Sequence, residues 1–203
     1  MNGYTAKSGR FIPTRQSMLR LNWGEFEIAA GTPLAAFANG ASTTPGTAFD
    51  NSKCAGVRWN NDAAPAAMYA SVLLPEHRKP QSDIIVHVLA AKSGATLADA
   101  TTFAVNAWAQ TNGALQDAAT DAGGTTTAMV GNAAAKTLQH LTLTLKGSNL
   151  PDAVESANPG INGNVPSVLT LGIKPTGGTL GTDDVTISAI WLEYTENFAP
   201  LVP

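Results

Sequence analysis

Eight short runs of alternating apolar and polar residues occupy most of the sequence between residues 23 and 197, separated by clusters of Gly, Pro, Asn and Thr. Alternation with period 2 is typical of a strand with one buried and one exposed face. The runs read WGEFEIAA, CAGVRWN, AMYASVLLP, DIIVHVLAA, TTFAVNAWA, KTLQHLTLTL, SVLTLGIKP and DDVTISAIWLEYTEN. We therefore predict an all-β fold, an antiparallel two-sheet sandwich of jelly-roll type.

The two ends of the chain lack this alternation. Residues 1–22 are predicted to form an extended basic N-terminal arm, 23–196 the sandwich domain, and 197–203 a short tail that contains two prolines. No acidic residue precedes Glu25. The four basic residues of the arm are Lys7, Arg10, Arg15 and Arg20. Such an arm suits an acidic neighbouring surface, although a solvated terminus has the same composition.

The last run changes phase along its length. Val185 and Ile187 alternate with polar residues, but large apolar groups then enter the phase that had been polar. These groups are Ile190, Leu192 and Tyr194. One interpretation makes them an interface between identical subunits, and the other places a β-bulge near Ala189, which returns them to the core of their own chain.

Composition limits the classes of partner. Charged residues make up 13% of the chain, against roughly 25% in an average soluble domain, so a polar but weakly charged surface is expected to pack against other protein. The net charge of −3 argues against a nucleic-acid partner. No apolar run is long enough to span a membrane and no signal core is present, which predicts folding in a cytoplasm. A single cysteine, Cys54, excludes an intrachain disulfide.

The sequence has no motif for catalysis. A phosphate-binding loop and a nucleophile elbow are both absent, so we predict no catalytic residues and no cofactor. His87 and His140 lie in the phase opposite the predicted core, where a carboxylate would complete a metal site, but no local ligand spacing supports one and we predict no metal. Asp183 and Asp184 follow a Gly-rich loop; calcium ligation and turn capping both fit them, and the turn is favoured.

One tryptophan supports a different interpretation. Trp108 falls in the phase opposite Phe103, Val105 and Ala107, so its ring is expected on the outer face of a sheet. There it is positioned to stack on a sugar ring, as in a lectin-like sandwich. The competing interpretation is that the four tryptophans fill the core or an interface, which is their usual role.

The chain resembles the virion structural proteins of tailed bacteriophages, above all the capsid decoration, or cement, proteins of jelly-roll type. The resemblance is carried by the runs KSGATLADATTFAVNAWAQ and TLGTDDVTISAIWLEYTE and by the Ala/Thr/Gly-rich, weakly charged composition with its basic arm and Pro-containing tail. It spans most of residues 55–196 and includes no diagnostic motif.

This resemblance implies a non-enzymatic protein that binds the outside of a phage capsid as a homotrimer and stabilises the lattice. The major capsid protein and further copies of the chain are then the expected partners, and the capsid surface of the virion is the expected location. The alternative is a carbohydrate-binding module of a phage fibre, spike or tail, which binds through Trp108.

Overall fold

The computed structural model describes residues 4–7, 10–28, 32–35, 45–50, 54–60, 65–75, 77–95, 101–110, 121–131, 133–151, 154–155, 164–165, 167–176 and 183–197. The strands are β1 (Tyr4–Lys7), β2 (Arg10–Leu21), β3 (Glu27–Ile28), β4 (Thr32–Pro33), β5 (Gly46–Asp50), β6 (Cys54–Trp59), β7 (Met68–Leu73), β8 (Ile84–Lys92), β9 (Phe103–Gln110), β10 (Gly124–Thr125), β11 (Gln139–Leu145), β12 (Val154–Glu155), β13 (Asn164–Val165), β14 (Val168–Pro175) and β15 (Val185–Asn197). In the described part of the chain two 3₁₀ turns, η1 (Trp23–Glu25) and η3 (Gly147–Asn149), lie between strands.

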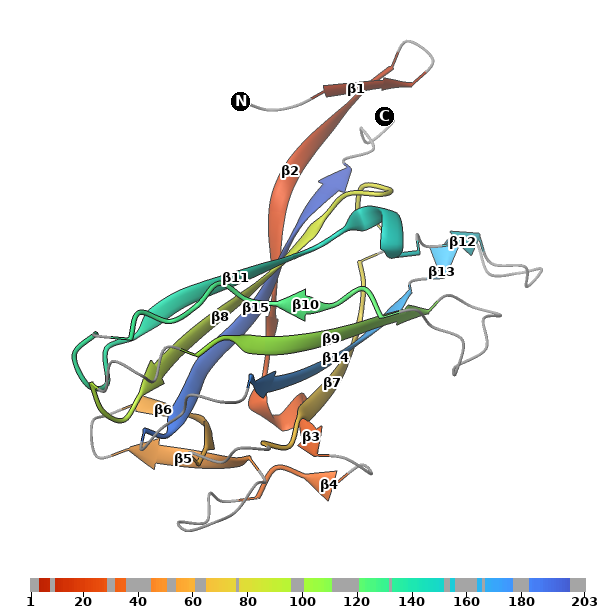
Figure 1. Ribbon diagram of the computed structural model, residues 1–203. Helices are drawn as coiled ribbons and strands as arrows, with labels where there is room; N and C mark the ends of the chain where they lie inside the picture. Colours follow the sequence, from red (N-terminus) through yellow and green to blue (C-terminus); the bar gives the residue numbers. More distant parts are fainter. Residues whose placement is uncertain are drawn as a thin grey trace.

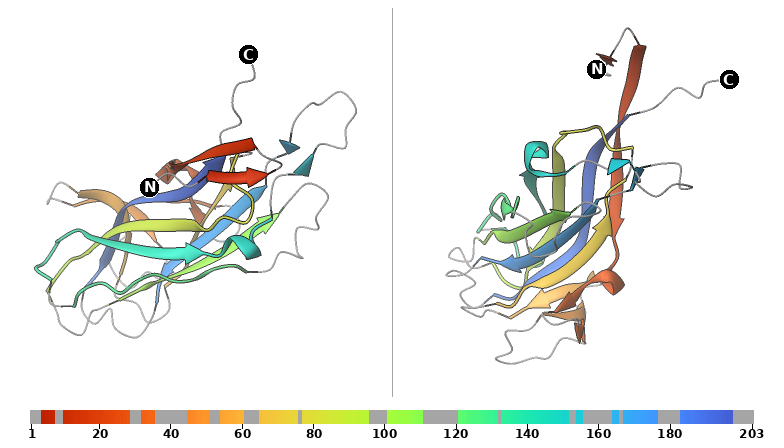
Figure 2. Two further views of the ribbon diagram at one scale, coloured as in Figure 1. Left: turned by 90° about the horizontal axis from the view of Figure 1, so that it is seen from above. Right: turned by 90° about the vertical axis from the view of Figure 1, so that its right-hand side faces the viewer.

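Apart from β12 and β13, which pair with each other, these strands form two large antiparallel sheets. One contains β1, β2, β15, β6 and β5, with β8 and β11 paired in succession on the other edge of β15. The second has the order β10-β9-β14-β7-β3-β4. In the right-hand view of Figure 2, β9 and β14 lie on one side of the molecule and β2 on the other. The predicted all-β antiparallel sandwich is confirmed, and each of the eight runs contributes a strand.

The core lies between the sheets and follows the predicted alternation. From the six-stranded sheet it receives Phe103 and Val105 of β9 and Leu171 of β14, all at most 1% exposed. From the other sheet it receives Val86 and Val88 of β8, both fully buried. Trp59 is also buried, with its ring centroid 6.3 Å from that of Phe103 and its Nε1–H donated to the Ala66 carbonyl. The alternation of side chains along each strand thus creates one apolar layer.

β15 runs through the centre of the larger sheet and contains the phase change (Figure 1). Ile187 pairs with Ala90 of β8, whereas Ala189 pairs with Leu89, so Ser188 is the extra residue of a β-bulge. The same bulge separates two partners on the opposite edge, where β6 pairs with residues 185–187 and β2 with residues 190–197.

The bulge corrects the predicted oligomer interface. Beyond it Ile190 is 0% exposed, Leu192 1% and Tyr194 7%, so all three lie in the core of their own chain. Because a side chain changes face with every residue, one inserted residue transfers the whole apolar set from the outer to the inner face. Trp191 and Glu193 take the outward positions instead.

The predicted arm is also corrected in part. Residues 14–21 of β2 pair with residues 190–197 of β15, so this stretch belongs to the sandwich, and a domain boundary at residue 22 does not match the edge of the sheet. Residues 10–13 pair with β1 and extend beyond the rest of the sandwich (Figure 1). Asn197 ends β15, and the remainder of the predicted tail, 198–203, lies outside the described residues.

Gly56 of β6 lies against the bulge. A Cβ at this position would overlap the backbone carbonyl of Ile187 and come within 3.0 Å of Thr186 Cγ2. We expect Gly56→Ala to lower the free energy of unfolding by about 1–3 kcal/mol, because the clash is with backbone that cannot move aside. Chemical denaturation measures the loss. Ser188→Ala is the control, since among the described residues the buried Ser188 hydroxyl has no hydrogen-bond partner and its removal should cost little. Equal losses in the two variants would contradict this account.

Candidate functional site

The outer face of the six-stranded sheet, called here the platform face, bears aromatic and polar side chains. Tyr69 of β7 and Trp108 of β9 alternate with buried neighbours and are half-buried themselves. Their rings are close to parallel, with centroids 6.4 Å apart and planes inclined by 26°. The platform face therefore presents two adjacent rings that are not part of the core.

A glycine makes this arrangement fit. Gly172 of β14 is the register partner of Tyr69, and Trp108 lies on the other neighbour of β14. A Cβ at Gly172 would lie 2.7 Å from Cε1 of Tyr69 and 3.4 Å from Cζ3 of Trp108. Both rings therefore lean over the central strand of the three, where a larger residue would push them outward.

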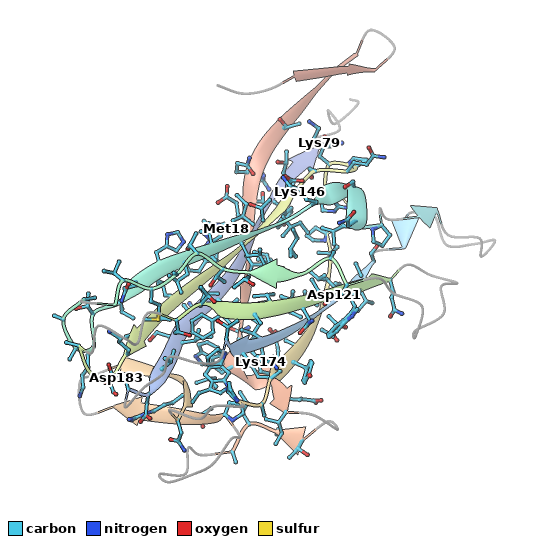
Figure 3. The ribbon with its side chains drawn as sticks, in the orientation of Figure 1. Met18, Lys79, Asp121, Lys146, Lys174 and Asp183 are labelled. Carbon is cyan, nitrogen blue, oxygen red and sulfur yellow. The ribbon has the colours of Figure 1, made fainter. Side chains whose placement is uncertain are left out.

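Asp121 holds the end of the platform face beside Trp108, with which it forms an isolated antiparallel bridge. One carboxylate oxygen accepts hydrogen bonds from the backbone N–H groups of Ala107 (2.7 Å) and Gly123 (2.8 Å), and the other accepts one from Asn106 Nδ2 (2.5 Å). Partial burial acts to raise the pKa of Asp121, but these hydrogen bonds outweigh it and hold the pKa below its ordinary value. Lys174 lies toward the opposite end of the face (Figure 3) and is exposed.

A depression of about 330 Å³ adjoins the aromatic pair and is lined by Glu25, Glu27, Tyr69, Ala70 and Ser71. Its size is at the lower end of the range for small-ligand sites. Glu25 accepts hydrogen bonds from the backbone N–H (2.9 Å) and Nδ2 (3.4 Å) of Asn22, which anchors it on the η1 turn. Glu27, the register partner of Tyr69, is exposed and forms no hydrogen bond or ion pair within the described residues.

Sequence reasoning identified Trp108 and missed its partners. The signal for Tyr69 was present, since it alternates with Met68 and Ala70 in the run AMYASVLLP and so had to face outward. The signal for Gly172 was a glycine inside an apolar strand, which marks a close approach of another group. The contact between these residues depends on the strand order β9-β14-β7, which no local pattern contains.

Two of the four basic residues of the predicted arm, Arg15 and Arg20, have side chains that the structure describes. Arg15 donates from Nε to Glu196 (2.8 Å), whose other oxygen accepts the Tyr194 hydroxyl (3.0 Å). Partial burial acts to raise the pKa of Glu196, but its hydrogen bonds, led by that from Arg15, keep the pKa below its ordinary value. Burial, with the hydrogen bond to Glu196, raises the pKa of Tyr194 to about 12. Arg20 is exposed opposite Trp191, and the side chains of Lys7 and Arg10 lie outside the described residues.

The aspartates after the Gly-rich loop are both paired with cations. Asp184 receives two hydrogen bonds from the Arg58 guanidinium, and its backbone N–H donates to Ser93 Oγ (2.9 Å). Asp183 lies 4.0 Å from the buried Lys92 ammonium and is itself 5% exposed. These contacts hold both carboxylates against cations at the start of β15, and the predicted capping of a turn stays a prediction.

A second cluster lies on the outer face of the seven-stranded sheet. His87 of β8 is bonded through Nδ1 to Nε2 of His140 on β11 (2.8 Å) and through Nε2 to Glu193 of β15 (3.1 Å). The Trp191 ring is parallel to His87 within 1°, at a centroid distance of 4.7 Å. The histidines and carboxylate considered for a metal site are thus brought together, but the two imidazoles are bonded to each other. Within the described ranges no group of three or more His, Cys, Asp or Glu is arranged to hold a metal ion.

Comparisons with known proteins give similarities at the level of structure. No model of a protein family matches the chain, and no curated protein sequence does. A solved structure of the xylan-binding module CBM15 is 12% identical, with a TM-score of 0.48 over 89% of this chain and 97% of that one. The CBM22-1–GH10 modules of Clostridium thermocellum xylanase 10B, complexed with xylohexaose, are 12% identical, with a TM-score of 0.45 over 93% of this chain and 29% of that one.

Bacteriophage CBA120 tailspike protein 4, represented by its enzymatically active domain, is also similar. It is 10% identical, with a TM-score of 0.35 over 88% of this chain and 19% of that one.

In the part of the chain that the structure describes, no helix is long and apolar enough to span a membrane.

Gly172→Ala tests how the aromatic pair is held. The new methyl group would meet one edge of the Tyr69 ring, so we expect the rings to separate while the free energy of unfolding falls by only about 1 kcal/mol. Near-UV circular dichroism follows the rings, and thermal unfolding follows the fold. Gly24→Ala is the control, since a Cβ there meets no atom within 4 Å. An unchanged aromatic spectrum in Gly172→Ala would show that the glycine does not position the rings.

Proposed function

We propose that the chain is a non-catalytic carbohydrate-binding module and that the platform face is its binding site. The observation that supports this most is the aromatic pair, in which Tyr69 and Trp108 lie nearly parallel and half-exposed over Gly172. One face of a pyranose ring presents C–H groups, and a flat aromatic ring outside the core suits that face. Rings on β7 and β9, the two strands that flank β14, can cover successive sugars of an oligosaccharide.

Polar groups beside the rings supply the second requirement. A sugar stacked on Tyr69 directs its hydroxyls sideways, and such hydroxyls need hydrogen-bond partners to offset the loss of water. Glu27 has an accepting carboxylate without a partner inside the described ranges, and the Ser71 hydroxyl is bonded to that of Thr170 (2.8 Å). Lys174 adds an exposed donor further along the face. Orientation and specificity would come from these groups, and affinity from the rings.

The capsid-decoration function remains a separate prediction with less support from the described residues. The side chains expected at the trimer interface, Ile190, Leu192 and Tyr194, are buried in the chain itself, and Arg15 of the arm is bonded to Glu196. We therefore favour carbohydrate binding over attachment to a major capsid protein on the surface of the virion. Light scattering after size exclusion checks the homotrimer, which would have about three times the 20.9 kDa mass of the chain.

Trp108→Ala tests the proposed function. Removing the larger ring should weaken glycan binding about thirtyfold or more, since truncating a central aromatic anchor typically costs about 2 kcal/mol or more. Binding is measured by affinity electrophoresis against neutral polysaccharides, xylan among them, and then by calorimetry on the best ligand.

Trp191→Ala is the matched control, because it removes the same ring from the opposite sheet. Thermal unfolding of both variants confirms that each is folded. Equal affinity in the wild type and Trp108→Ala, or an equal loss in the two variants, would contradict the assignment of the platform face. A wild-type chain that binds no glycan in the panel or on a glycan array would contradict the function itself.

A further inference from the structure

The cluster on the outer face of the seven-stranded sheet is built from three strands and lies on the other sheet from the platform face. His87 pairs in register with Trp191 of β15 and with Thr142 of β11. It is 7% exposed, whereas His140 on the same face is exposed and Glu193 is half-buried. A buried imidazole therefore lies between a carboxylate and a second imidazole, and the hydrogen bonds determine which ring nitrogens carry hydrogens.

The contacts allow one arrangement of hydrogens when Glu193 is ionised and both histidines are neutral. A carboxylate only accepts, so His87 carries its hydrogen on Nε2, which faces Glu193. Its Nδ1 then carries a lone pair, and the Nε2–H group of His140 must donate a hydrogen bond to it. The atom left over is Nδ1 of the exposed His140.

This arrangement takes up two protons with different consequences. The first can enter at Nδ1 of His140 without breaking a hydrogen bond, and it gives a cation separated from Glu193 by one neutral ring. On the imidazoles, the one atom left for the second proton is Nδ1 of His87. Two N–H groups would then face each other across the 2.8 Å that separates the ring nitrogens, and the bond between the histidines would be lost.

We propose that Glu193, His87 and His140 form a two-step proton switch on the outer face of the β11–β8–β15 sheet. The cluster takes up one additional proton without losing a hydrogen bond. The second proton releases His140 from His87 and exposes Trp191, whose ring is parallel to both imidazoles within 8°.

The charges around the cluster are consistent with this order. On β15 the charged neighbour is Glu193. Its negative charge, which lies next to His87, favours uptake of the first proton by the cluster. On β2, Arg20 pairs with Trp191 and Met18 with Glu193, so Arg20 is the cation nearest in register and opposes further positive charge. On β8 and β11 the register partners are uncharged: Ile85 lies opposite Glu193, and Leu89 opposite His140. Burial also lowers the pKa of His87 below 6.5, although its hydrogen bond to Glu193 works against this.

Side-chain ¹⁵N NMR of the imidazoles tests the switch between pH 8 and 5. At pH 8 we expect both rings to carry their hydrogen on Nε2. As the pH falls, the first proton that the cluster takes up should leave the Trp191 indole resonance unchanged. His87 should follow at lower pH and shift that resonance, which is assigned with Trp191→Phe.

Two variants isolate the coupling between the rings. In His140→Ala the proton affinity of His87 should rise about tenfold, because Nδ1 becomes free and no imidazolium stands beside it. In Glu193→Gln the affinity should fall, because the carboxylate charge is gone. His77→Ala, which removes an exposed histidine in a turn, is the control. It should change neither the His87 imidazole resonances nor the Trp191 indole resonance.

Several results would overturn the proposal. They are a His87 hydrogen on Nδ1 at pH 8, the same His87 midpoint in the wild type and His140→Ala, and a Trp191 resonance that follows His140 instead of His87. Because these readouts involve no glycan, they are independent of the outcome for the platform face.

Stability gives a separate check on the sign. Since the pKa of His87 is lower in the folded chain than its ordinary 6.5, the unfolded chain binds this proton more tightly. The contribution of the neutral cluster is therefore complete above about pH 6.5 and is lost as the pH falls below it. Thermal unfolding between pH 8 and 5.5 should show this decline in the wild type and a smaller one in His140→Ala. A wild-type decline no larger than that of His140→Ala would contradict the coupling.

Discussion

The pairing of β15 with three other strands, interrupted by the bulge at Ser188, is the constraint on which the rest of the structure depends. Before the bulge β15 lies between β8 and β6, and after it between β8 and β2. Without the extra residue, Ile190 and Leu192 would face outward, and Glu193 would enter the apolar layer with a carboxylate that has no partner there. The bulge thus completes the core and, in the same step, creates the outer cluster.

Much of this fold follows from alternation alone. The buried phases of β7, β8, β9 and β14 are those that the runs predict, because each strand separates an apolar layer from solvent. β2 was missed for two reasons. Its sequence RFIPTRQSMLRL contains a proline and no clean alternation, and its partner lies at the far end of the chain, where Thr14 meets Asn197. The bulge was one of two open interpretations. A change of phase alone does not distinguish a bulge, which returns the apolar residues to the core, from a second apolar face that packs against another subunit.

The candidate sites could be predicted to the level of single residues, and their assembly could not. Trp108 was assigned to an outer face by its phase, and His87 and His140 by theirs. What joins them is long-range: Tyr69 reaches Trp108 only because β14 lies between their strands, and Glu193 reaches His87 only because the bulge turns it outward. Local patterns assign the face of a side chain, and the strand order assigns its neighbours.

The two outer faces differ in kind although both carry aromatic rings. On the platform face the rings are Tyr69 and Trp108, and the neighbouring Asp121 is held ionised by its hydrogen bonds. On the other face the Trp191 ring lies against the two imidazoles of the proposed proton switch. The sandwich core separates the two, and a packed apolar layer carries no proton between them. One fold thus presents a face with a pair of aromatic rings over a glycine and, on the other sheet, a face with the proposed proton switch.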